Sequence, residues 1–125
     1  MNYEILGGKT AVVTGASRGI GQHIARALAL AGAQVAITGR DAGTLQDAAR
    51  IIGQTCRWFV CDQRDPEAIV RAGASIISEM GVPDILVNNA GIMLFESVVD
   101  MSVEKWNEVI ETNLTGSFLM TKVFL

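Results

Sequence analysis

The sequence predicts an α/β fold built on a doubly wound parallel sheet. Short β-branched runs alternate along the 125 residues with longer segments whose apolar residues recur at helical spacing. Glycine or proline falls between most of these segments, where turns are needed. Half of the residues are hydrophobic and 18% are charged, a composition that excludes intrinsic disorder. At this length a single domain is expected.

The first half of the chain consists of two predicted strand–helix pairs. Residues 9–14 (KTAVVT) form a β-branched run, and residues 19–31 carry apolar side chains at helical spacing. Gly32 follows as a helix C-terminal cap would. Residues 34–38 (QVAIT) are again typical of a strand, and residues 41–52 place their aliphatic side chains on one helical face.

The second half repeats the alternation. After the strand-like RWFV segment, Asp65 and Pro66 are typical of an N-cap followed by the first helical residue. DILV then forms a fourth strand, and a last helix is expected from Ser102 onward. The predicted strands are residues 9–14, 34–38, 57–60 and 84–87, and the predicted helices are residues 19–31, 41–52, 65–80 and 102–125.

This element order predicts how the strands are arranged. Strands separated by helices of this length cross over right-handed and lie parallel, which gives a Rossmann-like sheet with the expected order 3-2-1-4. Such sheets bind ligands at the carboxyl ends of their strands, where the order reverses. We therefore expect the loops after Thr14 and Val87 to face each other across a cleft.

A glycine-rich segment, TGASRGIG, directly follows the first strand and opens the first helix. Glycine lets the chain turn sharply, and the free N–H groups and positive dipole end of a helix bind anions such as a pyrophosphate. An ordinary βα turn is the alternative interpretation. The spacing Gly15-x3-Gly19-x-Gly21 differs from G-x-G-x-x-G, and no lysine follows as in a P-loop, so an NTPase is disfavoured.

The end of the second strand indicates which dinucleotide would bind. An acidic residue that would bond a ribose 2′-hydroxyl is missing there; Gly39 and Arg40 stand in its place, and Arg18 lies in the glycine-rich loop. Two guanidinium groups suit a 2′-phosphate, so NADP(H) is preferred to NAD(H). Alternatively, both arginines are solvated surface charges, and Asp41 partly neutralises Arg40.

Further motifs complete a family resemblance. Asp62 follows the third strand, NNAG (residues 88–91) follows the fourth, and Asn113 lies in the last helix. Together with the glycine pattern, these residues resemble the first half of the short-chain dehydrogenase/reductase family over essentially the whole chain. Within that family the segments ASRGIG (16–21) and IETNL (110–114) are most similar to 3-oxoacyl-acyl-carrier-protein reductases.

The resemblance implies an oxidoreductase that uses NADP(H) to transfer hydride between nicotinamide and a carbonyl or alcohol. In the family the glycine-rich loop binds phosphates, the Arg40 position meets the adenosine phosphate, Asp62 and its neighbour face adenine, and the NNAG loop passes beneath a ribose. The implied cofactor-binding residues are Gly15, Ser17, Arg18, Gly19, Ile20, Gly21, Arg40, Asp62, Gln63, Asn89, Ala90 and Gly91. Alternatively, Asp62 caps a turn and the asparagines of NNAG stabilise a loop.

The catalytic residues of the family are matched only in part. Asn113 resembles the asparagine whose backbone carbonyl holds a water in the proton relay, or else it is an ordinary polar helix residue. The family also uses a Ser, a Tyr and a Lys four residues after the Tyr, whereas the one tyrosine is Tyr3, with Gly7 four residues later. We therefore expect residues 1–125 to be a truncated, inactive dinucleotide-binding domain; the alternative is a non-catalytic binding or regulatory module.

Charge and hydropathy limit the partners and the location. With 10 basic and 13 acidic residues, the chain has no general basic face for nucleic acid. Neither a signal peptide nor an apolar run of about 18 residues is visible, so a cytoplasmic protein without membrane contact is expected. The apolar end of the last helix predicts a homo-oligomer. A small carbonyl or alcohol is the implied substrate.

The remaining residues are interpreted as structural. Cys56 and Cys61 are too few and too poorly spaced for a four-ligand zinc site, so no metal is expected and both are interpreted as buried thiols. Trp58, Phe59 and Trp106 are expected in the core, with an interface as the alternative position for Trp106.

Overall fold

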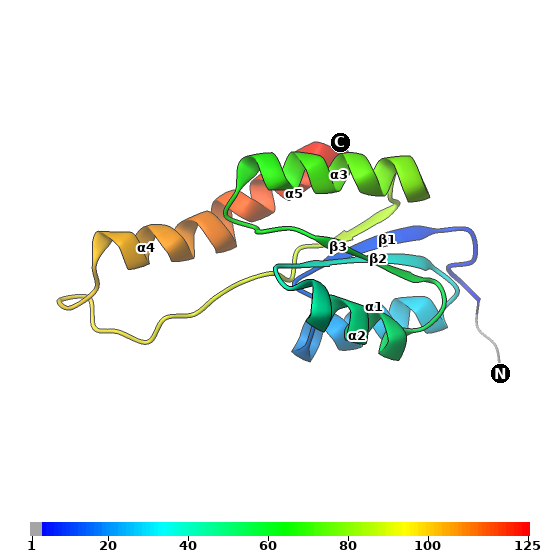
Figure 1. The fold of residues 1–125 in the computed structure, drawn as a ribbon, viewed down its shortest axis with the longest axis horizontal. Helices are drawn as coiled ribbons and strands as arrows, with labels where there is room; N and C mark the ends of the chain where they lie inside the picture. The colour runs from blue at the N-terminus through cyan, green and yellow to red at the C-terminus, as the bar shows by residue number, and fades with distance from the viewer. Residues whose placement is uncertain (1–3) are drawn as a thin grey trace.

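The computed structural model describes residues 4–125 and has one parallel sheet between two layers of helices (Figure 1). The strands are β1 (Thr10–Thr14), β2 (Gln34–Gly39), β3 (Cys56–Val60) and β4 (Ile85–Val87). Their spatial order is β3-β2-β1-β4, which confirms the predicted order. Val12 of β1 pairs with Ala36 on one side and Leu86 on the other.

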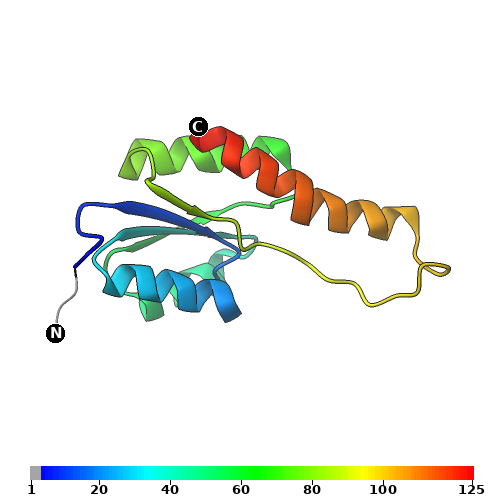
Figure 2. The same ribbon diagram turned by 180° about the vertical axis from the view of Figure 1, so that it is seen from behind.

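Helices cover both faces of the sheet. The α-helices are α1 (Gly19–Leu30), α2 (Ala42–Ile52), α3 (Pro66–Met80), α4 (Val103–Ile110) and α5 (Gly116–Phe124). Helices α1 and α2 lie on one face, and α3 and α5 lie side by side on the other, as Figures 1 and 2 show from opposite sides. Every predicted strand and helix is present, with ends shifted by a few residues at most.

The alternation of side chains along β1 divides the core between the two faces. Val13 packs in the cluster that includes Ile37 and Leu45, on the side of α1 and α2. Its neighbour Val12 points the other way and packs with Ile76 of α3. All five residues of β1 are buried, as expected for a central strand covered on both faces.

Side-chain caps fix where three of the helices begin. The Asp41 carboxylate accepts hydrogen bonds from the backbone N–H groups of Gly43 and Thr44. Asp65 caps α3 through Glu67, and Ser102 caps α4 through Lys105. Each cap satisfies N–H groups that have no partner within the helix.

The last helix differs from the prediction of one uninterrupted helix. A π-helical turn (Glu111–Thr115) separates α4 from α5. The helical spacing of apolar residues continues through this turn, and so periodicity alone does not reveal the extra residue that a π turn accommodates.

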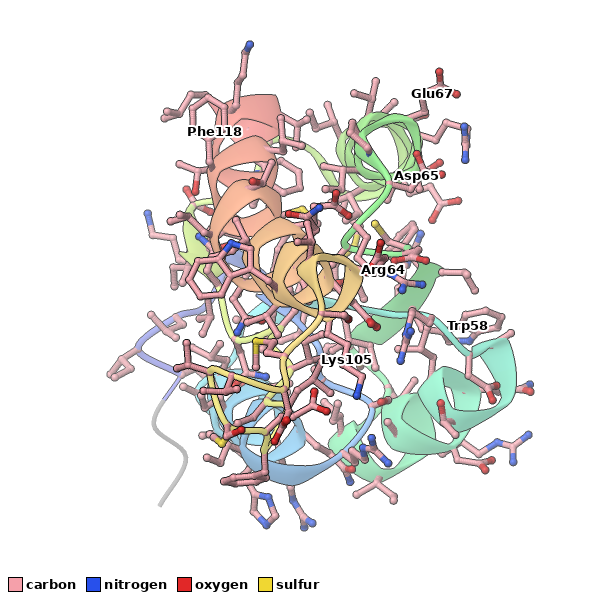
Figure 3. All side chains as sticks on the ribbon, turned by 90° about the vertical axis from the view of Figure 1, so that its left-hand side faces the viewer. Trp58, Arg64, Asp65, Glu67, Lys105 and Phe118 are labelled. Atoms are coloured by element: carbon pink, nitrogen blue, oxygen red, sulfur yellow. The ribbon has the colours of Figure 1, made fainter. Side chains whose placement is uncertain are left out.

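The expectation that three aromatic residues lie in the core was correct only for Phe59. Phe59 is 9% exposed, whereas Trp58 is 38% and Trp106 57% exposed. Trp58 lies on β3, at the edge of the sheet (Figure 3), and Trp106 belongs to α4, which extends beyond the sheet (Figure 1). Neither residue has a second layer to cover it.

Of the two cysteines, Cys61 is buried and Cys56 partly buried, and both are free thiols.

Within residues 4–125, no helix is long and apolar enough to cross a membrane. The same residues contain no cluster of three or more His, Cys, Asp or Glu side chains suited to a metal ion. Tyr3 lies outside the described part of the chain.

Candidate functional site

The loops after β1 and β4 are joined directly by hydrogen bonds between Thr14 and the NNAG segment. The buried Thr14 hydroxyl accepts from the backbone N–H groups of Asn89 (3.0 Å) and Ala90 (2.9 Å) and donates to the carbonyl of Val87 (3.4 Å). The Asn89 side-chain amide donates in turn to the carbonyls of Thr14 (3.0 Å) and Gly15 (3.1 Å). The two loops therefore lie together where the strand order reverses, as predicted, but hydrogen bonds join them directly, whereas the prediction had them facing each other across a cleft.

A cleft of about 280 Å³ opens at this edge of the sheet. Its walls come from the loops after all four strands and from α4 and the π turn. The lining residues are Gly15, Ser17, Arg18, Thr38, Gly39, Arg40, Cys61, Asp62, Gln63, Arg64, Asn89, Ala90, Gly91, Ile92, Glu108 and Thr112. The carboxyl ends of parallel strands are where such sheets bind ligands.

The glycine-rich loop after β1 lines one end of the cleft and leads into the N-terminus of α1. A helix N-terminus is suited to binding an anion. Gly15 and Gly19 both have φ of +62°, a backbone conformation that side chains other than glycine rarely adopt. Arg18 is the N-cap of α1 but makes no side-chain cap bond, and no acidic residue lies in the first turn. The first N–H groups of α1 therefore remain available to a ligand, and the helix dipole favours an anion there.

Of the three arginines that line the cleft in the described part of the chain, Arg64 is paired with carboxylates and two are not. Arg18 and Arg40 both line it, and neither forms an ion pair with any of residues 4–125. Asp41, which the sequence left open as a partner for Arg40, uses its carboxylate to cap α2 instead, at 2.7 Å from the backbone nitrogen of Gly43. A guanidinium without a carboxylate partner is suited to a phosphate.

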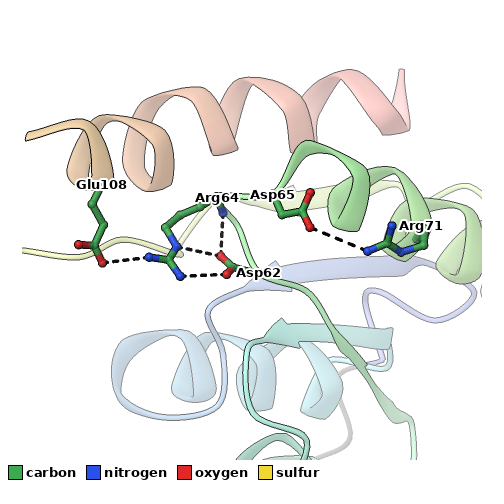
Figure 4. Close-up of polar contacts among 5 residues, drawn as sticks. All are labelled: Asp62, Arg64, Asp65, Arg71 and Glu108. Atoms are coloured by element: carbon green, nitrogen blue, oxygen red, sulfur yellow. Dashed lines mark hydrogen bonds and ion pairs between the residues drawn. The ribbon is translucent and has the colours of Figure 1, made fainter. Parts of the chain in front are cut away.

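The opposite wall contains a charged network that the sequence did not predict (Figure 4). Arg64 donates to Asp62 through its backbone N–H and its guanidinium, and to Glu108 of α4 at 3.2 Å. Chiefly through the side-chain hydrogen bonds, Arg64 holds the pKa of Asp62 below its ordinary value. Asp62 is therefore ionised near neutral pH and acts only as a hydrogen-bond acceptor.

Gln63 lies deeper in the same wall. It is 7% exposed and packs beneath the π turn, where a Cβ on Gly116 would lie 2.8 Å from the Gln63 carbonyl oxygen. Its Nε2 atom and the hydroxyl of the neighbouring cleft residue Thr112 are buried and find no hydrogen-bond partner among residues 4–125. Gln63 therefore supports the wall, with its side chain under the helix.

Asn113 projects from the π turn to the loop after β4. Its side chain accepts from the N–H of Ile92 and donates to the carbonyl of Ile92, both at 2.8 Å. Its own backbone carbonyl accepts from the Ser117 hydroxyl at 2.9 Å. Asn113 thus holds the loop that borders the cleft without lining the cleft itself.

The structure brings together most of the predicted site residues and separates a few. Gly19, Ile20 and Gly21 do not line the cleft; Gly21 is buried beside Asn89, and the Ile20 side chain is 75% exposed. Arg64, Glu108 and Thr112 were missed. Arg64 stands only two residues after Asp62, a spacing that places it in the same loop, whereas the role of Glu108 required the tertiary structure.

This architecture defines a Rossmann-like α/β fold with a cleft at the carboxyl ends of its parallel strands. The family model for short chain dehydrogenase matches residues 9–125, and the chain belongs to that family. It is 41% identical to 3-oxoacyl-[acyl-carrier-protein] reductase FabG of Escherichia coli (strain K12), over all of this chain and 50% of the relative. The resemblance identified from the sequence is confirmed.

Solved structures support the same assignment. A metagenomic short-chain oxidoreductase in complex with NADP matches with a TM-score of 0.90 and 38% identity, over 94% of this chain and 55% of the other. A blue fluorescent protein from a metagenomic library, in complex with NADPH, matches with a TM-score of 0.89 and 32% identity, over 99% and 51%. The chain spans about half the length of the curated relatives it matches.

Proposed function

We propose that this chain binds NADP(H) in the cleft and contributes the dinucleotide-binding part of an oxidoreductase acting on a carbonyl or alcohol. The observation that carries the proposal is the pair of cleft arginines, Arg18 and Arg40, at the carboxyl ends of β1 and β2 without a carboxylate partner among residues 4–125. The open space beside Gly19, where a Cβ would meet nothing within 4 Å, fits a phosphate close to the backbone. Bound NADPH would supply the hydride.

Each part of the dinucleotide has a proposed place along the cleft. The pyrophosphate lies against the N-terminus of α1, and the 2′-phosphate lies between Arg18 and Arg40. Adenine lies beside Asp62, and the nicotinamide ribose lies over the NNAG loop. The proposed contacts that line the cleft are Gly15, Ser17, Arg18, Arg40, Asp62, Gln63, Asn89, Ala90 and Gly91. Gly19, Ile20 and Gly21 are proposed to act through the backbone at the N-terminus of α1.

The proposed reaction needs a proton donor from outside residues 1–125. No tyrosine in this sequence is followed four residues later by a lysine. Asn113 contributes in this proposal by holding the cleft loop and by offering its backbone carbonyl to a water. We expect the 125-residue chain to bind NADPH without oxidising it above background, because positioned general acids contribute about 10²–10⁴-fold to such reactions. Measured turnover by this chain would contradict that expectation.

Direct titration tests the binding proposal. The purified chain is titrated with NADPH and with NADH, and the nicotinamide fluorescence is followed. NADPH is expected to bind about 10–100-fold more tightly, because charge-assisted hydrogen bonds to the 2′-phosphate are each worth about 1.5–3 kcal/mol. Equal affinity for the two nucleotides would contradict the NADP(H) proposal.

A pair of variants locates the selectivity. Arg40→Gln should lower the preference for NADPH over NADH to a few-fold, whereas Arg50→Gln should leave it unchanged. Arg50 provides the matched control because it lies on α2, is exposed, and pairs with Asp47 outside the cleft. Selectivity that survives Arg40→Gln combined with Arg18→Gln would place the 2′-phosphate elsewhere.

We also propose that a second copy of the chain covers the outer face of the last helical segment. Trp106, Leu114 and Phe118 are 57%, 65% and 61% exposed, and Phe118 lies on the side of α5 away from α3 (Figure 3). Exposed apolar side chains grouped in this way are typical of an interface. Light scattering after size-exclusion chromatography should give a discrete oligomer that Phe118→Glu dissociates; a monomer at all concentrations would contradict this.

A cytoplasmic location stays a prediction from the sequence.

A further inference from the structure

The Asp62 carboxylate is almost fully occupied by a single neighbour. Its Oδ1 atom accepts from the Arg64 backbone nitrogen at 3.0 Å and from Nε at 3.1 Å, and its Oδ2 atom accepts from Nη2 at 3.0 Å. A carboxylate has about four acceptor sites, two on each oxygen. Arg64 therefore uses both sites on Oδ1 and one on Oδ2, and a single site on Oδ2 is left.

Arg64 is itself held by a second element of the same cleft wall. Its Nη1 atom donates to Glu108 at 3.2 Å, a residue of α4 that is 44 positions away. Nε and Nη2 bind Asp62 as a fork while Nη1 binds Glu108, so the planar guanidinium bridges the β3–α3 loop and α4 (Figure 4). The three side chains are between 36% and 39% exposed, so they line the cleft and remain accessible from it.

We propose that Arg64 is a positioning residue that fixes Asp62 with one free acceptor site and thereby makes the cleft selective for a base that carries an amino group. This inference rests on the proposed binding of NADP(H), with the base beside Asp62. The 6-amino group of adenine donates to the remaining site on Oδ2. A base with a carbonyl oxygen at that position turns an acceptor toward the carboxylate, and the fixed carboxylate cannot rotate away.

Without the two guanidinium hydrogen bonds from Arg64, the cleft loses its selectivity for a base with an amino group even though the Asp62 carboxylate remains. A free aspartate side chain rotates about two bonds and can turn from a carbonyl oxygen toward solvent or toward a ring N–H. The role of Arg64 is therefore distinct from a general attraction for phosphate, which is the same for every base. This distinction gives the proposal a measurable signature.

The test compares NADPH with its deamino analogue, in which hypoxanthine replaces adenine. The phosphates of the two nucleotides are identical. Their contribution to affinity therefore cancels in the ratio of the two dissociation constants. For the unaltered chain we expect NADPH to bind on the order of tenfold more tightly, a modest ratio because the site is partly open to water. Arg64→Gln should reduce this ratio to about twofold or less.

Two further variants separate the fork from the charge. Arg64→Lys keeps the charge but cannot form the fork, so it should also reduce the ratio. Arg71→Gln removes the same charge from an exposed arginine of α3 that pairs with Asp65 and Glu67 outside the cleft, and it should leave the ratio unchanged. Should Arg64→Gln fail to fold, as judged by circular dichroism, the Lys variant decides.

The possible failures are distinguishable. If the unaltered chain binds neither nucleotide, the proposed function is wrong. If it binds NADPH but shows no preference over the deamino analogue, or if Arg64→Gln and Arg64→Lys keep the full preference, the positioning role of Arg64 is overturned while the proposed function stands.

Discussion

Gly15 and Ala90 approach so closely that a Cβ atom on Gly15 would lie 2.7 Å from the Ala90 Cα atom. This contact brings the backbone of the glycine-rich loop against the backbone of the NNAG loop. Gly19, in the same loop and with the same φ of +62°, has nothing within 4 Å of the corresponding position. The two glycines therefore meet different requirements, and alanine substitutions separate them.

Gly15→Ala should destabilise the chain more than Gly19→Ala does. A left-handed backbone costs alanine about 1–2 kcal/mol at either position, and the clash with Ala90 adds about 1–3 kcal/mol at Gly15 alone. Chemical denaturation of the two variants measures the difference in the free energy of unfolding. Equal losses would mean that the two loops separate at little cost.

Thr14→Val should cost far more stability than Thr14→Ser. Valine has nearly the same shape, but it leaves the partly buried N–H groups of Asn89 and Ala90 without their acceptor, at about 1–3 kcal/mol each. Serine keeps the hydroxyl and loses only a methyl group, worth about 0.8 kcal/mol. Denaturation midpoints provide the comparison, and a valine variant as stable as the serine variant would show that water replaces these bonds.

Asn113→Ala should loosen the loop after β4 while leaving the sheet intact. The substitution removes both 2.8 Å hydrogen bonds to Ile92, so the backbone N–H of Ile92 should exchange with solvent faster, by about tenfold for each 1.4 kcal/mol lost. Asn107→Ala, on the exposed surface of α4, is the control. An unchanged exchange rate at Ile92 would mean that other contacts hold the loop.

The sequence was sufficient for the fold because the strand and helix periods are local and clear. The β-branched run that contains Val12 and Val13 and the helix start at Asp65 and Pro66 can be recognised within a few residues. The strand order then follows from general rules of handedness. The same rules predicted that the loops after Thr14 and Val87 lie at one edge of the sheet, but the direct hydrogen bonds between Thr14 and Asn89 were not predicted.

The features that were missed depend on contacts between distant residues. The Arg64–Glu108 pair joins positions 44 apart, and neither residue type is unusual for a surface. The π turn coincides with the Asn113–Ile92 bonds and the packing of Gln63 under Gly116, which no helical pattern encodes. Apolar periodicity identified the face that carries Trp106, but it does not reveal whether another layer covers that face.

The two cysteines should make the fold sensitive to alkaline pH. Burial raises the pKa of Cys56 to about 12 and, together with the nearby Asp62 and Asp65 carboxylates, raises the pKa of Cys61 to about 11, from an ordinary value of 9.0. The folded chain therefore holds these protons more tightly than the unfolded chain. Their contribution to stability is fully present below pH 9 and is lost as the pH rises toward 11 and 12.

The measurement is the free energy of unfolding in urea at several pH values between 8 and about 11, where the thiol linkage acts. The unaltered chain should lose stability steadily over this range, and Cys56→Ala combined with Cys61→Ala should show a shallower decline. The double variant differs from the unaltered chain only at the two cysteines, so the difference in slope belongs to the thiols. The absolute stability of the double variant is expected to fall, because Cys61 is 3% exposed, and only the slope is diagnostic. Parallel slopes would mean that the thiolates reach water without unfolding, through the cleft that Cys61 lines.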